Sequence, residues 1–429
     1  MKVLSVDIGT TTISAVVLDT ENGCLLESCT LPNDSAIPSA NPQEKMQDPK
    51  RIEEKVKQIT DRFCDADAIG FTGQMHGVVY VDAEGNAVSP LYTWQDGRAA
   101  GMCADINEKT GYSVSAGYGL ATHAFLCRQG QLPSSAVKLC TIMEYCISRL
   151  CGCKPVMHSS NAASLGFFRE GFDEDALKRV GADPSFLPAV TDECEMVGRY
   201  RGIPVAVAIG DNQAGFLGSV REPSQMSLAN FGTGSQISLL AQGRCQTDEE
   251  IELRPLMKGQ KLLSGSALCG GRAYAIMERF FRLYAGGDQY DRMNELALQG
   301  LKAPLTVRTT FCGTRQNPER LGSIESISED NWTPEALIAG TLMGMAQELH
   351  SLFERMPHAQ VRRLAASGNA VRKNPALQRA LEEVFGCEVL IPVHQEEAAF
   401  GAALFAAAAS GTETLETLMQ RCIRYQQLS

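Results

Sequence analysis

The amino-acid sequence predicts an α/β protein made of two similar lobes. The chain has 429 residues, enough for two or three domains, and 44% of them are hydrophobic, enough to fill the cores. Two predicted β-hairpins, over residues 2–19 and 225–240, carry similar Gly-Thr turns although they lie far apart in the chain. Segments with the apolar spacing of helices fill much of the rest of the second half.

The first lobe is expected to begin with the hairpin over residues 2–19, in which two apolar strands flank the turn Gly9-Thr10-Thr11-Thr12. A further strand is predicted over 24–30. Prolines and polar residues predict a surface loop over 32–49. Apolar residues at helical spacing then predict a helix over 49–63, and a short apolar run predicts a buried strand over 68–72.

A similar order of elements is predicted after residue 200. A strand over 204–209 precedes the second hairpin, whose strands 225–231 and 236–240 flank Gly232-Thr233-Gly234-Ser235. Helices follow over 270–284, 334–356 and 374–385. Both hairpins share Gly-Thr-x-(Thr/Ser) followed by Ile-Ser, which favours a duplicated lobe over chance similarity of two short turns. We expect the lobe boundary near 218–223, which divides the chain into residues 1–220 and 221–429.

Charge and cysteine content exclude several classes of protein. The net charge of −11 argues against a surface that neutralises nucleic-acid phosphates, so we expect no nucleic-acid partner. The 15 cysteines are odd in number and scattered, which favours reduced thiols in a cytoplasmic protein over a disulfide framework. The N-terminal residues lack the pattern of a signal peptide, and the apolar stretch 398–409 is too short to span a bilayer, so we expect no membrane partner.

The two Gly-Thr turns are the first candidates for chemistry. Glycine lets the backbone approach a ligand closely, and threonine adds hydroxyl donors, so Gly9, Thr10, Thr11 and Thr12 suit the phosphates of a nucleotide. Asp7, at the end of the preceding strand, suits Mg²⁺. An ordinary tight hairpin is the alternative. The second turn, with Gly232, Thr233 and Gly234, favours phosphate binding because two opposed turns can hold one phosphate chain. The chain contains no P-loop segment and no protein-kinase signature set.

A carboxylate follows the predicted strand 204–209, in Gly210-Asp211-Asn212-Gln213. Phosphorylation of an alcohol needs a base near the attacking hydroxyl, and Asp211 can accept that proton. Asn212 or Gln213 could orient neighbouring hydroxyls. The alternative is that Asp211 caps the following helix, and one residue could do both.

Two further segments offer side chains that could bind a sugar. Gln74, Met75 and His76 lie between glycines directly after the strand 68–72. Trp94 and Asp96 lie within Trp-Gln-Asp-Gly-Arg, which provides an aromatic face, an amide, a carboxylate and a guanidinium. Stacking combined with paired hydrogen bonds is a common way to hold a sugar. The alternatives are a turn with a surface histidine and an Asp–Arg ion pair beside a structural tryptophan.

Taken in order, these motifs resemble those of the FGGY carbohydrate kinases. The residues Asp7-Ile8-Gly9-Thr10-Thr11 are similar to the first phosphate motif of that family, and Asn230-Phe231-Gly232-Thr233-Gly234-Ser235 to the second. Ser367-Gly368-Asn369-Ala370, followed by Asn374, is similar to its adenosine segment, and 396–403 to its closing helix. Within the family, 73–77 and 94–98 look like ketose kinases such as xylulokinase, and 141–145 and 160–168 look like segments of sedoheptulokinase.

The resemblance implies a duplicated ribonuclease-H-like fold, as in actin-like ATPases, with a cleft between a sugar-binding lobe (1–220) and a nucleotide-binding lobe (221–429). It implies transfer of phosphate from MgATP to the terminal hydroxyl of a sugar. It makes Asp211 the base and Met75, His76 and Asn212 sugar contacts. The nucleotide contacts that it implies are Thr11, Thr233, Gly271 and Gly368, together with Asn369 and Asn374 of the adenosine segment.

Sedoheptulose is the first candidate substrate, D-xylulose the second, and another sugar or polyol the third. The small-molecule partners expected are the sugar and ATP, and a homodimer is a possible assembly. Two features depart from the family pattern: Asn369 stands where a second glycine is usual, and the chain is shorter than many members.

Two other classes of function are alternatives. A sugar- or nucleotide-sensing protein on the same fold would have lost its catalytic carboxylate, yet Asp7 and Asp211 are both present. An actin-like ATPase that activates a dehydratase through an iron–sulfur cluster would need grouped cysteines, and here only Cys151 and Cys153 are close in sequence.

Overall fold

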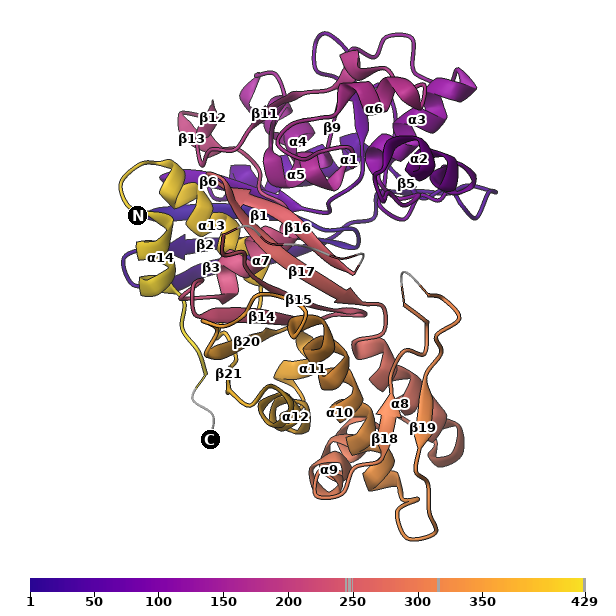
Figure 1. The fold of residues 1–429 in the computed structure, drawn as a ribbon. Helices are drawn as coiled ribbons and strands as arrows, with labels where there is room; N and C mark the ends of the chain where they lie inside the picture. Colours follow the sequence, from indigo (N-terminus) through magenta and orange to yellow (C-terminus); the bar gives the residue numbers. More distant parts are fainter. Residues whose placement is uncertain (244, 246–247, 249, 315–316, 427–429) are drawn as a thin grey trace. The chain divides into compact units, whose positions relative to one another are not determined.

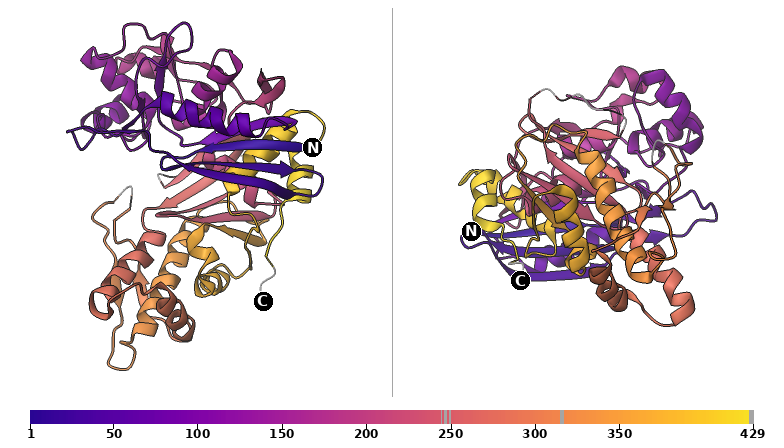
Figure 2. Two further views of the ribbon diagram at one scale, coloured as in Figure 1. Left: turned by 180° about the vertical axis from the view of Figure 1, so that it is seen from behind. Right: turned by 60° about the horizontal axis from the view of Figure 1, so that its bottom comes forward.

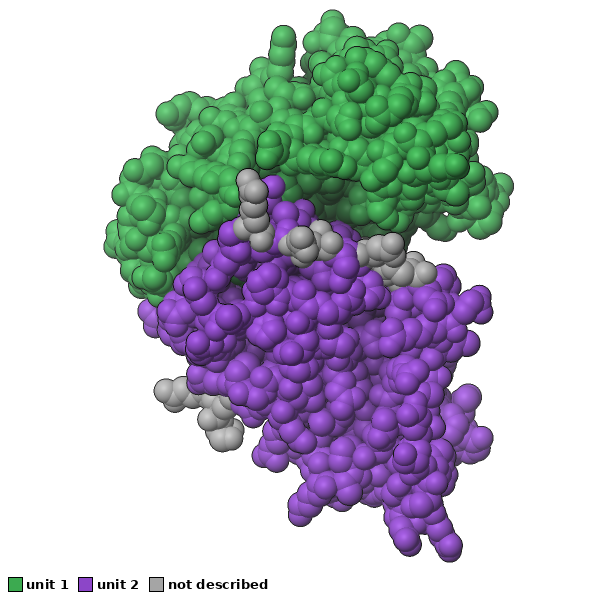
Figure 3. Space-filling model, in the orientation of Figure 1, with its two compact units in different colours: residues 1–218, 255–260, 396–422 green, residues 219–254, 261–395, 423–429 purple. Residues whose placement is uncertain are grey.

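The computed structural model describes residues 1–243, 245, 248, 250–314 and 317–426. The chain forms two compact units (Figures 1 and 3). Unit 1 comprises Met1–Gly218, Pro255–Gln260 and Glu396–Cys422, and unit 2 comprises Ser219–Arg254, Lys261–Gln395 and Ile423–Ser429. The C-terminal helices that follow residue 396 therefore belong to the unit that contains the N-terminus. The predicted assignment of sugar binding to 1–220 and nucleotide binding to 221–429 stays a proposal.

A six-stranded sheet forms the centre of unit 1, in the order β12-β13-β6-β1-β2-β3. The hairpin of β1 (Lys2–Ile8) and β2 (Thr12–Asp19) is antiparallel and continues into β3 (Cys24–Pro32). On its other side, β1 runs parallel to β6 (Ala68–Gly73), which is parallel to β13 (Ile203–Ala206); β12 (Met196–Tyr200) is the edge strand. The carboxyl ends of β1, β6 and β13 consequently lie at one edge of the sheet, the usual place for a ligand site in α/β proteins.

Both faces of this sheet are covered, as Figures 1 and 2 show. The core on one face contains Leu4, Val6 and Ile8 of β1 together with buried residues of α1 (Pro49–Arg62). On the other face, the hydroxyl of Ser5 donates to the Ala399 carbonyl of α13 (Glu397–Ala409), at 2.5 Å. Burial on both faces explains why β1 is apolar at nearly every position.

Smaller elements complete unit 1. They are β4 (Ala36–Ile37), β5 (Met46–Gln47), β7 (Val79–Val81), β8 (Leu91–Tyr92), α2 (Cys103–Thr110), α3 (Gly119–Gln129), β9 (Lys138–Cys140), α4 (Ile142–Cys151), β10 (Val156–His158), α5 (Ser159–Ser164), α6 (Glu174–Arg179), β11 (Ala189–Thr191), α7 (Asp211–Ser219) and α14 (Leu415–Cys422), with 3₁₀ turns at Ala100–Met102 and Pro184–Phe186.

Unit 2 contains a second six-stranded sheet, in the order β16-β17-β15-β14-β20-β21. Its hairpin joins β14 (Met226–Phe231) and β15 (Ser235–Leu240), and β15 pairs antiparallel with β17 (Gln260–Ala267). On the other side, β14 runs parallel to β20 (Arg363–Ser367), which runs parallel to β21 (Glu388–Leu390). The edge strand next to β17 is β16 (Ile251–Met257).

The helices of unit 2 are α8 (Gly271–Ala285), α9 (Tyr290–Gly300), α10 (Pro334–Phe353), α11 (Asn369–Arg372) and α12 (Pro375–Phe385). A short hairpin, β18 (Thr306–Arg308) and β19 (Ser323–Glu325), packs beside α10. Proline occupies the start of α10 and of α12, directly after the capping residues Thr333 and Asn374.

The two sheets repeat one plan: an antiparallel hairpin whose first strand runs parallel to two later strands. β1, β6 and β13 in unit 1 correspond to β14, β20 and β21 in unit 2. This confirms the predicted fold class, a duplicated ribonuclease-H-like α/β fold. Three details differ from expectation: the loop 32–49 contains β4 and β5, the strand predicted over 204–209 ends at Ala206, and α10 ends at Phe353 rather than 356. Beyond Ala206 the chain still bonds to its neighbours, because the N–H of Val207 donates to the Glu195 carbonyl at 3.0 Å and that of Ile209 to the Phe71 carbonyl of β6 at 3.1 Å.

Within the described residues, no helix combines the length and the apolar character needed to cross a membrane.

Candidate active site

The first Gly-Thr turn of unit 1 has its carbonyl groups held from one side. The amide of Asn33 donates to the Gly9 carbonyl at 2.7 Å, and its backbone N–H donates to the Thr11 carbonyl at 2.8 Å. The amide of Gln47 donates to the Thr10 carbonyl at 2.8 Å. In a trans peptide the carbonyl and the next N–H point in opposite directions, so the N–H groups that follow these carbonyls face away from Asn33 and Gln47. That arrangement presents a row of donors to an anion.

Three carboxylates influence one another at the edge of the unit 1 sheet. Asp7 lies near the end of β1, beside Thr72 of β6. Burial, and then the negative charges of Asp211 and Glu396, raise the pKa of Asp7 to about 7. Asp211 is the first residue of α7, and Glu396 directly precedes α13. The site therefore concentrates negative charge, which a bound cation would neutralise.

Asp211 occupies the first turn of α7 rather than the capping position. The N–H of Ala214 donates to the Gly210 carbonyl at 2.8 Å, so Gly210 is the residue that flanks the helix start. This weakens the alternative in which Asp211 serves only as a cap. The positive end of the helix dipole favours the ionised form of a carboxylate at this position. Asn212 is half-buried next to it in the same turn.

The segment that follows β6 brings Met75 close to this helix start, and His76 comes next in the chain. The terminal methyl of Met75 packs against Gly210, since a Cβ at Gly210 would lie 2.6 Å from it. His76 has a φ of 70°, which is uncommon for a residue other than glycine. Its ring lies 4.8 Å from that of Tyr118, and its Nδ1 lies 2.6 Å from the Ser164 carbonyl. Strained backbone of this kind is typical of functional sites.

Three of the other predicted sugar contacts have protein partners in the structure. Gln74 is buried, and its amide donates to Gln47 at 2.8 Å. Trp94 is 47% exposed, and its indole N–H donates to the hydroxyl of Thr10 at 3.0 Å. Asp96 is fully buried and forms an ion pair with Arg98 at 2.6 Å, the structural alternative that the sequence left open. Gln74 also accepts from the Thr10 hydroxyl at 3.4 Å, so Gln74 and Trp94 both contact the first Gly-Thr turn. A direct contact of Asp96 with a sugar stays a prediction.

The second Gly-Thr turn, in unit 2, is held in the same sense by different groups. The N–H of Gly271, at the start of α8, donates to the Gly232 carbonyl at 2.9 Å, and the N–H of Arg272 donates to the Thr233 carbonyl at 3.0 Å. The N–H groups of Thr233 and Gly234 consequently face away from α8. A Cβ at Gly271 would lie 2.7 Å from the Gly232 carbonyl oxygen, so the close approach requires glycine.

The predicted adenosine segment lies beside this turn. Gly368, between β20 and α11, has a φ of 97°, and a Cβ there would lie 2.3 Å from the Phe231 carbonyl oxygen. Asn369 is the first residue of α11. Asn374 is buried and caps α12, with its side-chain oxygen 3.1 Å from the N–H of Leu377. Unit 2 therefore brings Gly232, Gly271 and Gly368 together, whereas the side chain of Asn374 is engaged in the helix cap.

Several residues of these sites were not predicted from the sequence. Asn33 and Gln47 hold the first turn, yet they lie in a segment expected to be a surface loop. Glu396 acts on Asp7 although it is far away in sequence. In the sequence, the only indication of a role for Glu396 was its position at the start of the predicted closing helix.

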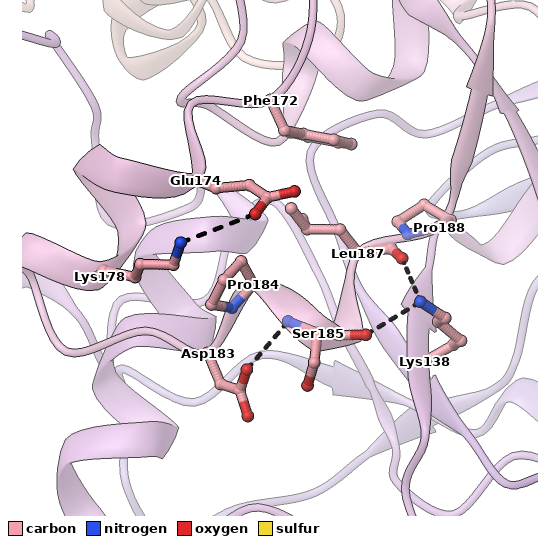
Figure 4. Close-up of a pocket in the computed structure, with 9 residues that line it drawn as sticks. All are labelled: Lys138, Phe172, Glu174, Lys178, Asp183, Pro184, Ser185, Leu187 and Pro188. Atoms are coloured by element: carbon pink, nitrogen blue, oxygen red, sulfur yellow. Dashed lines mark hydrogen bonds and ion pairs between the residues drawn. The ribbon is translucent and has the colours of Figure 1, made fainter.

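No set of three or more His, Cys, Asp or Glu side chains encloses a possible metal site in the described part of the chain. A separate pocket of about 620 Å³ lies beside α6 (Figure 4). Its lining includes no predicted site residue, and its charged groups have partners: Lys138 donates to the carbonyls of Ser185 and Leu187, and Glu174 pairs with Lys178. We assign no function to this pocket.

Comparison with known proteins agrees with this geometry. Residues 2–218 match the model of the N-terminal domain of the FGGY family of carbohydrate kinases, and residues 260–410 match the C-terminal domain. Sedoheptulokinase of Mus musculus is 27% identical, covering 94% of this chain and 96% of its own length. Xylulose kinase of Streptomyces coelicolor is 29% identical but covers 55% of this chain and 54% of its own.

A solved xylulose kinase from Rhodospirillum rubrum has the same fold, with a TM-score of 0.87 at 19% identity, covering all of this chain and 93% of its own. The resemblance found in the sequence is thereby confirmed: the chain belongs to the FGGY family of carbohydrate kinases and is a sugar kinase.

Proposed function

We propose that this sugar kinase transfers the γ-phosphoryl group of ATP to the terminal hydroxyl of a ketose. Sedoheptulose, giving sedoheptulose 7-phosphate, is the first candidate. The observation that carries the proposal is the position of Asp211, at the start of α7, with its charge acting on Asp7 and with Met75 packed against the preceding glycine. Asp211, Asp7 and Met75 are the residues that we propose as base, cation ligand and part of the sugar loop.

In the proposed reaction, Asp211 accepts the proton of the terminal hydroxyl as its oxygen attacks the γ-phosphorus. The new bond joins that oxygen to phosphorus, the bond from phosphorus to the β-phosphate oxygen breaks, and ADP leaves. His76 and Asn212 orient the sugar hydroxyls. The outward N–H groups of the turns Gly9–Thr12 and Gly232–Gly234 bind phosphate oxygens.

Asp7 would hold Mg²⁺, with Asp211 and Glu396 contributing negative charge nearby. The fit rests on the raised pKa of Asp7, because a cation would stabilise the ionised form of a carboxylate that is buried and has two others near it. A site with few protein ligands also suits Mg²⁺, which keeps several waters and binds phosphates. When bound, the ion would neutralise charge on the phosphates.

The choice of sugar rests on how the relatives align. The sedoheptulokinase of Mus musculus is 27% identical along 94% of this chain, whereas a xylulose kinase of Staphylococcus xylosus that covers the same share is 23% identical. Phosphorylation of D-xylulose to xylulose 5-phosphate is the alternative, followed by another sugar or polyol.

A cytoplasmic location is also part of the proposal. All 15 cysteines are free thiols, which suits a reducing compartment. A homodimer is the proposed assembly, and light scattering of the purified protein tests it.

The test is an assay of ADP release with a panel of heptuloses, pentuloses, hexuloses and polyols. We expect the highest kcat/KM with sedoheptulose. Asp211→Asn should lower kcat by about 10²–10⁴-fold with sugar and ATP binding nearly unchanged, because asparagine keeps the shape but cannot accept the proton. Asp173→Asn is the matched control, since Asp173 caps α6, outside the proposed site. Turnover of Asp211→Asn equal to that of the control would remove Asp211 from the role of base.

A further inference from the structure

The short helix α5 (Ser159–Ser164) contacts both the segment before Asp211 and the segment around His76. Four of its residues that matter here are buried, with exposed fractions of 6% or less: Ser159, Ser160, Asn161 and Ser164. Their polar side chains would be costly to bury without hydrogen bonds. Their partners therefore indicate what the helix does.

Ser160 links the turn before Asp211 to a buried histidine. The Gly210 N–H donates to the Ser160 hydroxyl oxygen at 3.0 Å. Nδ1 of His158 accepts from the Ser160 N–H at 3.2 Å, so it carries no proton, and the Ser160 hydroxyl 2.8 Å away must donate to it. Burial lowers the pKa of His158 to about 4, which keeps the ring neutral and this direction fixed. The chain of bonds thus runs from Gly210 through Ser160 to His158.

Asn161 holds the same turn one step earlier. Its amide donates to the Ala208 carbonyl at 3.1 Å and to the carboxyl of Glu144 at 2.8 Å. Glu144 is itself fixed by the capping box at the start of α4. The residues just before Asp211 are consequently held at Ala208 and at Gly210.

Ser164, at the other end of α5, holds His76. The His76 N–H donates to the Ser164 hydroxyl oxygen at 3.1 Å, and that hydroxyl donates to the Asn161 carbonyl at 2.7 Å. The Ser164 carbonyl, 2.6 Å from Nδ1 of His76, can only accept, so Nδ1 carries the proton. With the proton on Nδ1, the neutral tautomer of the ring has its unprotonated nitrogen at Nε2.

We propose that α5 is a positioning element for catalysis, in which Ser160 and Asn161 fix the turn that carries Asp211, and Ser164 fixes the backbone and the tautomer of His76. This inference rests on the proposed function. The two ends of α5 should therefore affect two different kinetic parameters. Ser160 acts on the base and hence on kcat, whereas Ser164 acts on the sugar loop and hence on the KM for the ketose.

The test compares three serine-to-alanine variants of α5. Ser160→Ala should lower kcat about 10-fold with the ketose KM within about twofold, because small misplacements of a reacting group are costly. Ser164→Ala should raise the ketose KM about 5–10-fold with a smaller change in kcat, because it leaves the His76 N–H without its acceptor. Ser159→Ala is the control: its hydroxyl donates to Asp192, at 2.5 Å, and contacts neither segment. Its kinetics should match those of the wild type.

Two further measurements separate positioning from a general loss of stability. Amide hydrogen exchange at Gly210 should become faster in Ser160→Ala but not in Ser159→Ala, whatever the activity. Ser160→Thr keeps the hydroxyl and should retain kcat within about threefold. If kcat, KM and melting temperature change together in all three alanine variants, or if Gly210 exchanges at the wild-type rate in Ser160→Ala, the inference about α5 is wrong.

Failure of the proposed function has a different signature. A wild-type protein that phosphorylates no sugar, or an Asp211→Asn variant with full turnover, would overturn the proposed reaction. An active wild type with an inactive Asp211→Asn, together with unchanged kinetics in Ser160→Ala and Ser164→Ala, would overturn the role of α5 alone.

Discussion

The contact between α7 and α13 allows a prediction of protein stability. Helix α7 begins at Asp211, and Glu396 directly precedes α13. The two helices are in contact at glycines. A Cβ at Gly401 would lie 1.8 Å from the Ala214 carbonyl oxygen of α7. Real Cβ contacts stay beyond about 3 Å, so Gly401→Ala must move the helices apart by roughly 1 Å, in a core that packs at crystal density.

The expected cost follows from two opposing terms. Overpacking in a core costs about 1–3 kcal/mol or more, while alanine gains about 1 kcal/mol over glycine in a helix. Because the clash at Gly401 is with backbone, which cannot rotate away, we expect a net loss of about 2 kcal/mol or more in the free energy of unfolding of unit 1. Urea unfolding followed by circular dichroism measures it.

The matched control is Gly215→Ala, on α7 itself. A Cβ at Gly215 would meet nothing within 4 Å outside its own helix, so only the propensity term applies. This variant should gain up to about 1 kcal/mol. Equal stability of Gly401→Ala and Gly215→Ala would refute the argument that the glycine contact sets the distance between α7 and α13.

Three further predictions concern the buried carboxyl, the second turn and the most acidic thiol. Burial raises the pKa of Glu144 to about 7, so the contribution of the protonated Glu144 carboxyl to the free energy of unfolding is full below about pH 4.5 and is lost as the pH rises through 7. In urea titrations, the wild type should therefore lose up to about 3 kcal/mol relative to Glu144→Gln between pH 4.5 and 8. Gly271→Ala should raise the KM for ATP about 10-fold with little change for the sugar in steady-state kinetics, because the new Cβ displaces the second turn. A hydrogen bond from Cys151 lowers the pKa of Cys153, which lines a cavity of about 990 Å³. Cys151→Ala should therefore slow the labelling of Cys153 by iodoacetamide. Labelling of the exposed Cys24 should not change, and mass spectrometry of peptides measures both.

The sequence was informative where local pattern decides the structure. The hairpins at 2–19 and 225–240 and the helices at 49–63 and 374–385 have strong apolar periodicity and clear turn or capping residues, and the structure confirms them within a few residues. The strand predicted over 204–209 ends at Ala206 as a regular strand, although Ile209 still donates its N–H to the Phe71 carbonyl of β6 at 3.1 Å. Regular pairing and isolated hydrogen bonds to a sheet occur with the same apolar pattern, so sequence alone could not separate them.

The candidate site was harder to predict because its polar side chains are buried with partners far away in sequence. Asp96 and Gln74 belong to types that contact sugars, and composition cannot distinguish a carboxylate that binds a ligand from one paired with Arg98. The role proposed for Ser160 depends on Gly210, fifty positions later, and on the neutral state of His158. Neither this contact nor the neutral state of His158 can be predicted from the spacing of neighbouring residues.

The duplicated turns show how one requirement can be met in two ways. Both present N–H groups by anchoring their carbonyls from behind. Unit 1 uses the side chains of Asn33 and Gln47 together with the backbone N–H of Asn33, whereas unit 2 uses the backbone N–H groups of Gly271 and Arg272. Side-chain anchors can be removed by mutation without changing the backbone, whereas backbone anchors cannot. Substitution of Gln47 by alanine should therefore loosen the first turn specifically, while the second turn is sensitive to changes that move α8. The Gly-Thr pattern common to both turns reflects the role that we propose for both. The hydrogen-bond donors that hold the turns lie outside that pattern, and they differ between the two units.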